Sequence, residues 1–144
     1  MSEHPKDRGE ISEAAVRYHF VAQGIPVLEP FGDNKRYDFV CKGQNEFFRV
    51  QVKTGRLSNG RVQFETRSSG SKTRRIAKEG YEGEIEVFAV FSYELDETFI
   101  VPIDEAPETT MGLRIQEPGK PSSTINWADD YRLADWIDSM GVDS

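Results

Sequence analysis

The chain has 144 residues, of which 37% are hydrophobic and 11% aromatic, so its length and composition predict one globular domain over residues 1–144. A single cysteine, Cys41, excludes an intramolecular disulfide framework and any metal site built from several cysteines. The N-terminus is charged and no apolar run is long enough to span a bilayer, so we expect a cytoplasmic protein with no membrane partner.

The formal charge of −7 is unevenly distributed along the chain. Residues 1–48 contain six basic and eight acidic side chains. Residues 49–78 contain nine basic side chains and one acid, Glu65, whereas residues 79–144 contain three basic and sixteen acidic side chains. This asymmetry predicts a basic surface that faces a polyanion and an acidic surface that faces solvent.

The first expected element is a helix from about residue 7 to residue 23. Asp7 and Glu10 have the spacing of a capping box, and Gly24 followed by Pro26 is typical of a helix end. Its expected apolar face consists of residues at helical spacing, namely Ile11, Ala14, Ala15, Tyr18 and Ala22.

Strands are expected next. Residues 36–41 and 47–54 flank a short turn and predict a hairpin, and residues 86–93 are apolar on both faces, which is typical of a central buried strand. Shorter strands are expected at residues 25–31, 61–66 and 99–103, with a flexible basic segment at residues 68–75.

The C-terminal part is expected to be irregular over residues 104–125 and helical over residues 127–140, with Asn126 as the cap and Gly141 at the end. The apolar face of this helix would be Leu133, Trp136, Ile137 and Met140. The order of helix, strands and helix predicts an α/β or α+β fold with a mixed sheet.

The strand at residues 47–54 carries the residues of greatest chemical interest. Side chains alternate between the two faces of a strand, so Val50 and Val52 share an apolar face, whereas Gln51 and Lys53 share the other. Asp38 interrupts an aromatic strand, and in the expected hairpin it lies beside Gln51 and Lys53. Carboxylate and amide oxygens are ligands that Mg²⁺ accepts, and a lysine can stabilise the charge of a phosphoryl transition state.

Simpler explanations of these residues remain open. Asp38 can face solvent or pair with Arg36 or Lys53, and Gln51 and Lys53 can belong to a solvated strand face. Glu13 on the first helix is spaced to pair with Arg17, a contact that stabilises a helix by only about 0.3–0.5 kcal/mol.

The ordered set of Glu13 on a helix, Asp38 on a strand and Gln51-Val52-Lys53 on the next strand resembles the PD-(D/E)XK nuclease superfamily. It is most similar to the branch with group I intron homing endonucleases, and more distantly to archaeal Holliday junction resolvases. The resemblance covers about residues 8–102 and leaves residues 103–144 as a C-terminal extension. Two residues depart from the pattern: Tyr37 stands at the proline position, and Gln51 stands where an acidic ligand is usual.

The resemblance implies a restriction-endonuclease-like fold and a DNA endonuclease that depends on Mg²⁺, with Mn²⁺ able to substitute. It implies that Asp38, Gln51 and Glu13 bind the metal and that Lys53 is the catalytic lysine. The charge pattern adds a set of expected DNA-backbone contacts: Arg49, Arg56, Arg61, Arg67, Lys72, Arg74, Arg75 and Lys78.

Two other functions remain open at this point. Because Gln51 removes a negative charge, the chain can be a DNA-binding module of the same fold without catalytic activity. The acidic balance of residues 79–144 also suits a small interaction protein. A nuclease that cuts both strands needs two active sites, so the sequence also leaves open a homodimer or a higher homo-oligomer.

Overall fold

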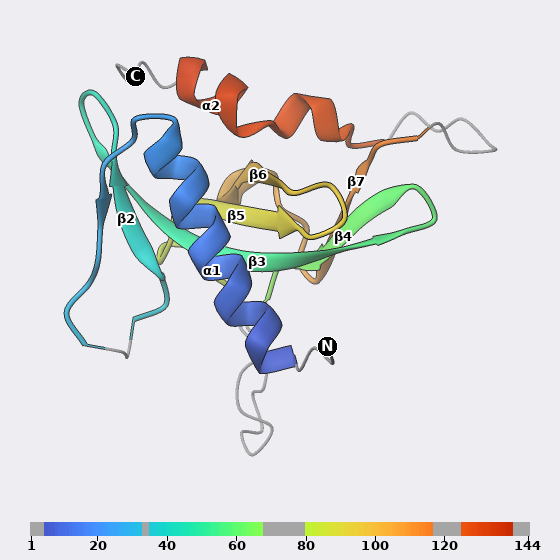
Figure 1. The fold of residues 1–144 in the computed structure, drawn as a ribbon, viewed down its shortest axis with the longest axis horizontal. Coiled ribbons are helices and arrows are strands. Elements are labelled where there is room, and N and C mark those ends of the chain that lie inside the picture. The colour runs from blue at the N-terminus through green and yellow to red at the C-terminus, as the bar shows by residue number, and fades with distance from the viewer. Residues whose placement is uncertain (1–4, 33–34, 68–79, 117–124, 140–144) are drawn as a thin grey trace.

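The structure, a computed structural model, describes residues 5–32, 35–67, 80–116 and 125–139. These residues form a seven-stranded mixed sheet with one long and one short α-helix (Figure 1). The helices are α1 (Pro5–Ala22) and α2 (Leu133–Ser139), and the short 3-10 helices are η1 (Ile103–Glu105) and η2 (Ala128–Tyr131). The strands are β1 (Val27–Leu28), β2 (Phe39–Lys42), β3 (Phe47–Ser58), β4 (Arg61–Glu65), β5 (Val87–Ser92), β6 (Glu97–Pro102) and β7 (Thr110–Arg114).

Strand β3 organises the sheet because it has twelve residues and three neighbours. Its first part pairs antiparallel with β2 and parallel with β5, and its last part pairs antiparallel with β4. Asn59 and Gly60 both have positive φ in the turn between β3 and β4, the conformation of a tight hairpin. The expected hairpin between residues 36–41 and 47–54 and the expected mixed sheet are therefore confirmed.

Hydrophobic cores lie on both faces of the sheet. On one face, Val50, Val52 and Ala89 pack against residues of α1. On the other face, Phe88 and Val90 pack against β4, β7 and Tyr81. Every residue of β5 is buried, which confirms the expected central strand.

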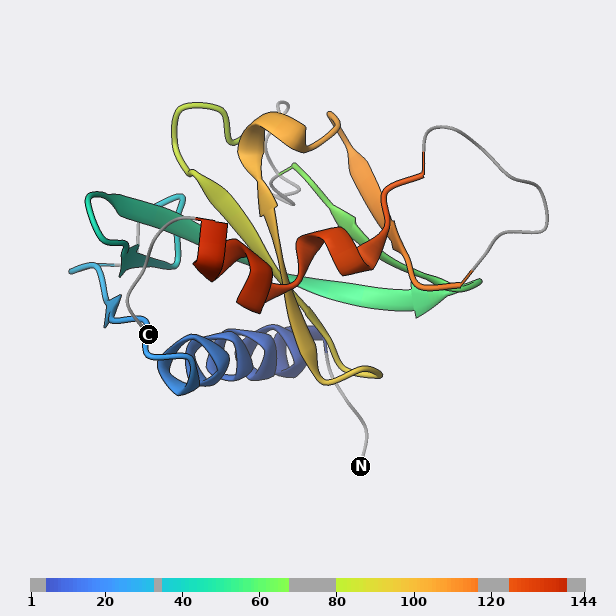
Figure 2. The ribbon, with the colours of Figure 1, turned by 90° about the horizontal axis from the view of Figure 1, so that it is seen from above.

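Helix α1 crosses β3 and β5 on one face of the sheet, and the β3–β4 hairpin extends beyond it (Figures 1 and 2). Its buried residues are Ser12, Val16 and Phe20, and the Ser12 hydroxyl lies 2.7 Å from the Thr54 hydroxyl of β3.

The expected apolar face of α1 is not the face that packs on the sheet, so this prediction is wrong. Most of its members point outward: Ile11, Ala14, Tyr18 and Ala22 are exposed, and Ala15 is half-buried. The expected capping box is wrong as well, because the helix begins at Pro5 and Asp7 already lies in its first turn. Gly24 follows the helix with a φ of 83°, which confirms the expected end.

The C-terminal part contains more regular structure than expected. Strand β7 pairs with β4 within the stretch expected to be irregular. The last helix is split into η2 and α2, and Trp127, without a side-chain capping hydrogen bond, takes the capping position expected for Asn126. Leu133 and Ile137 are buried as expected. Among the described residues, no helix is both long and apolar enough to cross a membrane.

Candidate functional site

The candidate site lies where β3 changes partners. Its pairing with β2 ends at Val50, and its pairing with β4 begins at Arg56. Residues 51–55 therefore pair with none of the described strands on this edge, although β5 continues to pair with them on the other. Backbone groups on an open edge need other partners, so this gap is a place where side chains approach the strand.

Asp38 occupies this open edge. Its backbone N–H donates to the Val50 carbonyl at 2.8 Å, which continues the pairing of β2 by one residue. Its carboxylate Oδ2 accepts a hydrogen bond from the Val52 N–H, also at 2.8 Å. Burial raises the pKa of Asp38 to about 6, although the Val52 hydrogen bond lowers it; among the nearby charges, that of Glu13 raises it and that of Arg17 lowers it.

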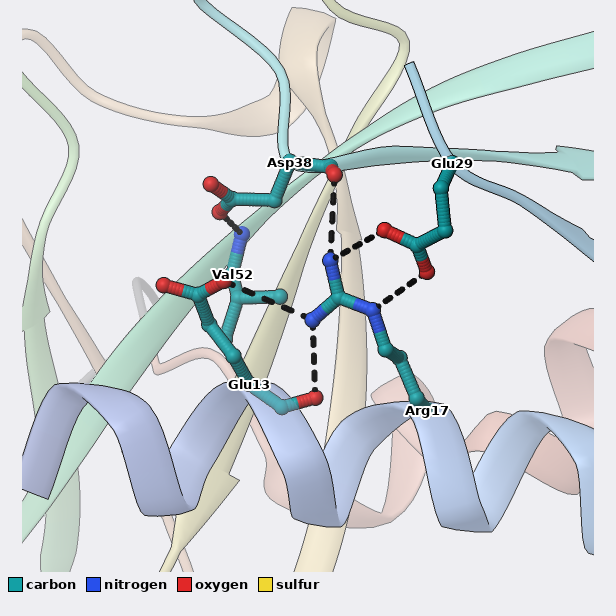
Figure 3. A network of polar contacts seen from close by, with 5 residues as sticks. All are labelled: Glu13, Arg17, Glu29, Asp38 and Val52. Carbon is teal, nitrogen blue, oxygen red and sulfur yellow. Dashed lines mark hydrogen bonds and ion pairs between the residues drawn. The ribbon is translucent and has the colours of Figure 1, made fainter. Parts of the chain in front are cut away.

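Glu13 approaches Asp38 from α1 (Figure 3). Its carboxylate is about half exposed, at 45%, and lies 3.4 Å from the guanidinium of Arg17. The pairing with Arg17 that the spacing predicts is thus present. The same geometry also brings a second carboxylate close enough to Asp38 to raise its pKa.

Arg17 connects the segments around the site (Figure 3). It donates to both carboxylate oxygens of Glu29, at 2.6 and 3.0 Å, and to the backbone carbonyl of Asp38 at 3.1 Å. It also donates to the backbone carbonyl of Glu13 at 3.0 Å. Sequence reasoning assigned Arg17 only to a helix-surface pair, because the spacing along one helix gives no sign of contacts with residues 29 and 38.

Lys53 lies on the opposite face of β3 from Val52. Its ammonium donates to the Arg67 carbonyl at 3.1 Å and lies 5.0 Å from the centre of the Tyr81 ring. Its charge lowers the pKa of Asp38, so the two side chains influence each other through space. The contact with the Tyr81 ring helps to fix the position of the Lys53 ammonium.

Gln51 follows Val50, the last residue of β3 that pairs with β2, and it is half-buried. Strand alternation places its side chain on the face of Lys53, and its position along β3 places it beside Asp38. The structure thus brings Asp38 close to Glu13 and Lys53, with Gln51 next to it along β3.

The donor atoms at this edge suit a hard divalent cation. Asp38 and Glu13 supply carboxylate oxygens, and Gln51 supplies an amide oxygen. Burial together with the Glu13 charge makes the ionised form of Asp38 costly, and a cation would relieve that cost. The described residues contain no group of three or more His, Cys, Asp or Glu arranged to hold a metal, so this set depends on Gln51 or on water for further ligands.

A pocket of about 420 Å³ opens beside Lys53. Thr54 and Arg56 of β3 line it, together with Gln63 and Glu65 of β4, and Arg8 of α1 contributes a cation from the other side. A second pocket of about 270 Å³ shares Arg8, Thr54 and Arg56 with it. Arg8 was not expected at the site, because nothing in its sequence context points to β3.

The expected DNA contacts differ in their surroundings. Arg56 and Arg61 are exposed, and Arg56 lines both pockets. Arg49 forms a two-pronged ion pair with the carboxylate of Glu86, and its hydrogen bonds lower the pKa of Glu86. The positive charge of Arg49 is therefore already neutralised by Glu86. Arg67 is half-buried and its carbonyl holds Lys53. The remaining expected contacts lie outside the described residues, as does the segment of residues 68–75: Lys72, Arg74, Arg75 and Lys78.

Comparison with known proteins defines the class. The model of the PD-(D/E)XK endonuclease family matches residues 3–134, and the chain belongs to this family. Among solved structures, the bacterial homing endonuclease I-Ssp6803I is similar, with a TM-score of 0.69 and 20% sequence identity over 96% of this chain and 95% of that chain. This likeness confirms the expected restriction-endonuclease-like fold. No match was found among curated proteins.

Proposed function

We propose that the chain is a metal-dependent endonuclease that hydrolyses phosphodiester bonds of DNA at the open edge of β3. The observation that carries this proposal is Asp38. Its carboxylate is held on the Val52 N–H, its pKa is raised to about 6, and the charges of Glu13 and Lys53 act on it. Carboxylates with a perturbed pKa are typical of catalytic sites, Lys53 lines a pocket of about 420 Å³, and membership of an endonuclease family supports the same reaction.

In this proposal Asp38, Gln51 and Glu13 hold Mg²⁺, with Mn²⁺ as a substitute. When bound, such a cation neutralises phosphate charge and lowers the pKa of a coordinated water. The half-buried carboxylate of Asp38 keeps oxygen lone pairs for a cation, because it has only one hydrogen-bond partner among the described residues.

The chain's own groups have separate roles in the proposal. Lys53, held by Tyr81 and the Arg67 carbonyl, is placed to donate to a phosphate oxygen as negative charge develops on it. Arg17 keeps Asp38 and Glu13 in position. Arg8 and Arg56 bind the DNA backbone along the pockets, which lie next to Lys53.

The proposal includes the setting of the reaction. The partner is DNA, and a cytoplasmic location would supply both DNA and Mg²⁺. A single copy has one such site, so a cut of both strands requires a homodimer or a higher homo-oligomer.

The test is nicking of supercoiled plasmid in Mg²⁺ or Mn²⁺ by the wild-type protein, Asp38→Ala and Lys53→Ala. Lys42→Ala is the matched control, because Lys42 is an exposed lysine at the end of β2. We expect nicking by the wild type and the control and loss of about 10²-fold or more in the other two. Equal nicking by all four proteins, or none by the wild type on duplex, branched and single-stranded DNA, would overturn the proposal.

Gln51 favours one alternative, a DNA-binding module without catalytic activity. At an effective dielectric constant of 20, one missing charge at about 4 Å from another changes the interaction energy by about 4 kcal/mol, an upper guide. The alternative predicts salt-sensitive DNA binding, no Mn²⁺ binding that depends on Asp38, and no nicking.

A further inference from the structure

Arg36 joins the segment that carries Asp38 to the segment that carries Tyr81. It lies two residues before Asp38, and its guanidinium stands over the Tyr81 ring, 4.1 Å from the ring centre. It donates to a carboxylate oxygen of Glu84 at 2.9 Å and to the Gly80 carbonyl at 3.2 Å. One side chain therefore contacts the Tyr81 ring and also residues that precede and follow Tyr81 in the chain.

Tyr81 contacts both Arg36 and Lys53. The tyrosine is 4% exposed, and its ring meets the ring of Phe88 on β5 edge-on, with 5.4 Å between the two ring centres. The Lys53 ammonium lies 3.5 Å from the Tyr81 hydroxyl oxygen and 5.0 Å from the centre of the ring. A movement of the Tyr81 ring would therefore change the surroundings of the Lys53 ammonium.

The contacts of Tyr81 restrict a lysine that is otherwise flexible. Lysine carries its charge on a four-carbon stem with large rotamer entropy, so a defined ammonium position needs fixed partners. Two partners of Lys53 are the Arg67 carbonyl, at 3.1 Å, and Tyr81. Tyr81 is a fixed partner only because its own ring is held, and the contacts with Phe88 and Arg36 hold it.

A simpler explanation of Arg36 is an ordinary surface ion pair with Glu84, and exposed pairs of this kind contribute little to stability. The Arg36 side chain is only 25% exposed, however, and a cation over a buried ring interacts more strongly than one over an exposed ring. The ion pair accounts for the hydrogen bond with Glu84. It does not account for the contact with a buried ring that also reaches Lys53.

We propose that Arg36 is a positioning residue, which fixes the Lys53 ammonium relative to Asp38 by holding the Tyr81 ring in place. The proposal rests on the proposed function, in which Lys53 donates to a phosphate oxygen and Asp38 binds the metal. These two groups must fit the same phosphate, so their separation has to be kept within narrow limits. Arg36 is bonded into the segment of Asp38 and acts on Lys53 through Tyr81.

The first test follows the position of Lys53 by NMR, without DNA or metal. The ammonium lies 5.0 Å from the ring centre of Tyr81 and 5.9 Å from that of Phe88, so ring currents shift the resonances of the neighbouring methylene protons. The spectrum of Lys53→Ala identifies these resonances by their absence. Arg36→Met keeps an unbranched stem and removes the guanidinium, and we expect it to move the Lys53 resonances toward those of an exposed lysine.

The matched control is Arg132→Met, because Arg132 also pairs with carboxylates, those of Glu97 and Asp129, and should leave the Lys53 resonances unchanged. Glu84→Gln is a milder second variant, since it weakens the hydrogen bond to Arg36 and leaves the ring contacts intact. We expect it to move the Lys53 resonances in the same direction by a smaller amount. Circular dichroism shows whether each variant folds, and Glu84→Gln decides the question if Arg36→Met does not.

The second test compares kcat and KM for nicking in Mg²⁺. A shift of about 1 Å in a catalytic group can cost about 10²-fold in rate, so we expect Arg36→Met to lower kcat by about tenfold or more and to change KM by less than about twofold. Because Arg36 acts through the lysine, the same substitution should have little further effect on the residual nicking of Lys53→Ala. Calorimetric titration should give the same Mn²⁺ affinity in Arg36→Met as in the wild type.

The proposal would be overturned by Lys53 resonances that stay unchanged in both Arg36→Met and Glu84→Gln. A rise in KM at unchanged kcat would overturn it as well, since it would show that Arg36 contacts DNA, and so would weaker Mn²⁺ binding, which would show that Arg36 acts on Asp38. If the wild type does not nick DNA, the proposed function fails, whereas the NMR comparison still decides whether Arg36 fixes Lys53.

Discussion

At the scale of single residues, Asp38 of the proposed site is held in place at a cost to stability. Its carboxylate is half-buried and accepts one backbone hydrogen bond, and its pKa is raised rather than lowered. An acid whose pKa is higher in the folded state binds protons more tightly there. Between the pKa of about 4 in the unfolded chain and the folded value of about 6, the free energy of unfolding therefore falls as the pH rises.

Because the raised pKa of Asp38 lowers the free energy of unfolding at neutral pH, we expect Asp38→Asn to stabilise the protein there. The amide is close in size and its oxygen can still accept from the Val52 N–H, but it carries no charge to bury. Without metal, we expect a gain of about 2–3 kcal/mol above pH 7, because each pKa unit corresponds to 1.36 kcal/mol. The gain should disappear near pH 4. Urea denaturation at both pH values measures it, and an Asp38→Asn protein less stable than the wild type at pH 7.5 would contradict the account.

Whereas Asp38 lowers the stability of the protein at neutral pH, Arg17 raises it, because its hydrogen bonds join α1 to Glu29 and Asp38. Replacement by alanine leaves Glu29 without its two hydrogen bonds and the Asp38 carbonyl without its donor. We expect a loss of about 1–3 kcal/mol in the free energy of unfolding. Arg132→Ala is the matched control, because Arg132 is itself more exposed in its pairs with Asp129 and Glu97, and its loss should cost less than about 1 kcal/mol. Equal losses in urea denaturation would show that Arg17 is an ordinary surface residue.

At the scale of elements, the sequence predicted the strands better than the buried face of α1. The alternation in residues 47–54 predicts a strand with one apolar and one polar face, and the apolar run in residues 86–93 predicts a central buried strand. Both strands are present, as β3 and β5. Helix α1 carries two stripes, one with Val16 and Phe20 and one with Ile11 and Tyr18. Both have helical spacing, and only the docking on the sheet decides which stripe is buried.

Contacts between distant segments explain what else was not predicted. Strand β7 is five residues long, and its pairing with β4 joins segments some fifty residues apart. The position of Asp38 beside Gln51 and Lys53 follows from a local hairpin, so it could be predicted. The contacts of Arg17 with Glu29 and of Arg8 with the pocket depend on how α1 docks, and no local pattern encodes them.

Strand β3 passes between β4 and β5 at Gly55, and the packing there leaves no room for a side chain. A Cβ at this position would lie 2.4 Å from Val62 Cγ1 and 2.9 Å from Val90 Cγ1. Gly55→Ala should therefore lower the free energy of unfolding by about 1–3 kcal/mol. Gly9→Ala is the control, since its Cβ meets nothing within 4 Å in α1 and should stabilise by about 0.5–1 kcal/mol. Thermal denaturation compares the two, and a tolerated Gly55→Ala would contradict the described packing.

At the scale of the whole molecule, a protein with a net charge of −7 concentrates its basic side chains in one part of the chain. The basic residues next to Lys53 come from both α1 and β3, so the fold adds Arg8 to the cations of residues 49–78. DNA binding should therefore be strongly salt-dependent despite the overall charge.

Under the proposed function, the salt dependence of the DNA affinity distinguishes cations that contact phosphates from cations that are already paired within the protein. We expect the slope of log affinity against log salt to decrease in magnitude by about 0.9 in Arg56→Ala, the loss of one phosphate contact. Arg49→Ala should change the slope less, because Arg49 is paired with Glu86. Fluorescence anisotropy with a labelled duplex measures both slopes, and a larger effect of Arg49 would show that the pair opens on binding.

The most direct test of the central claim, a metal site at the open edge of β3, is calorimetric titration of Mn²⁺ into the protein without DNA. We predict binding that Asp38→Ala abolishes and that Gln51→Glu, which restores an acidic ligand, strengthens by about tenfold or more. Near pH 6, where Asp38 is partly protonated, binding should release a fraction of a proton that is absent at pH 8. Binding of equal strength in the wild type and Asp38→Ala, or no binding even in Gln51→Glu, would contradict the account.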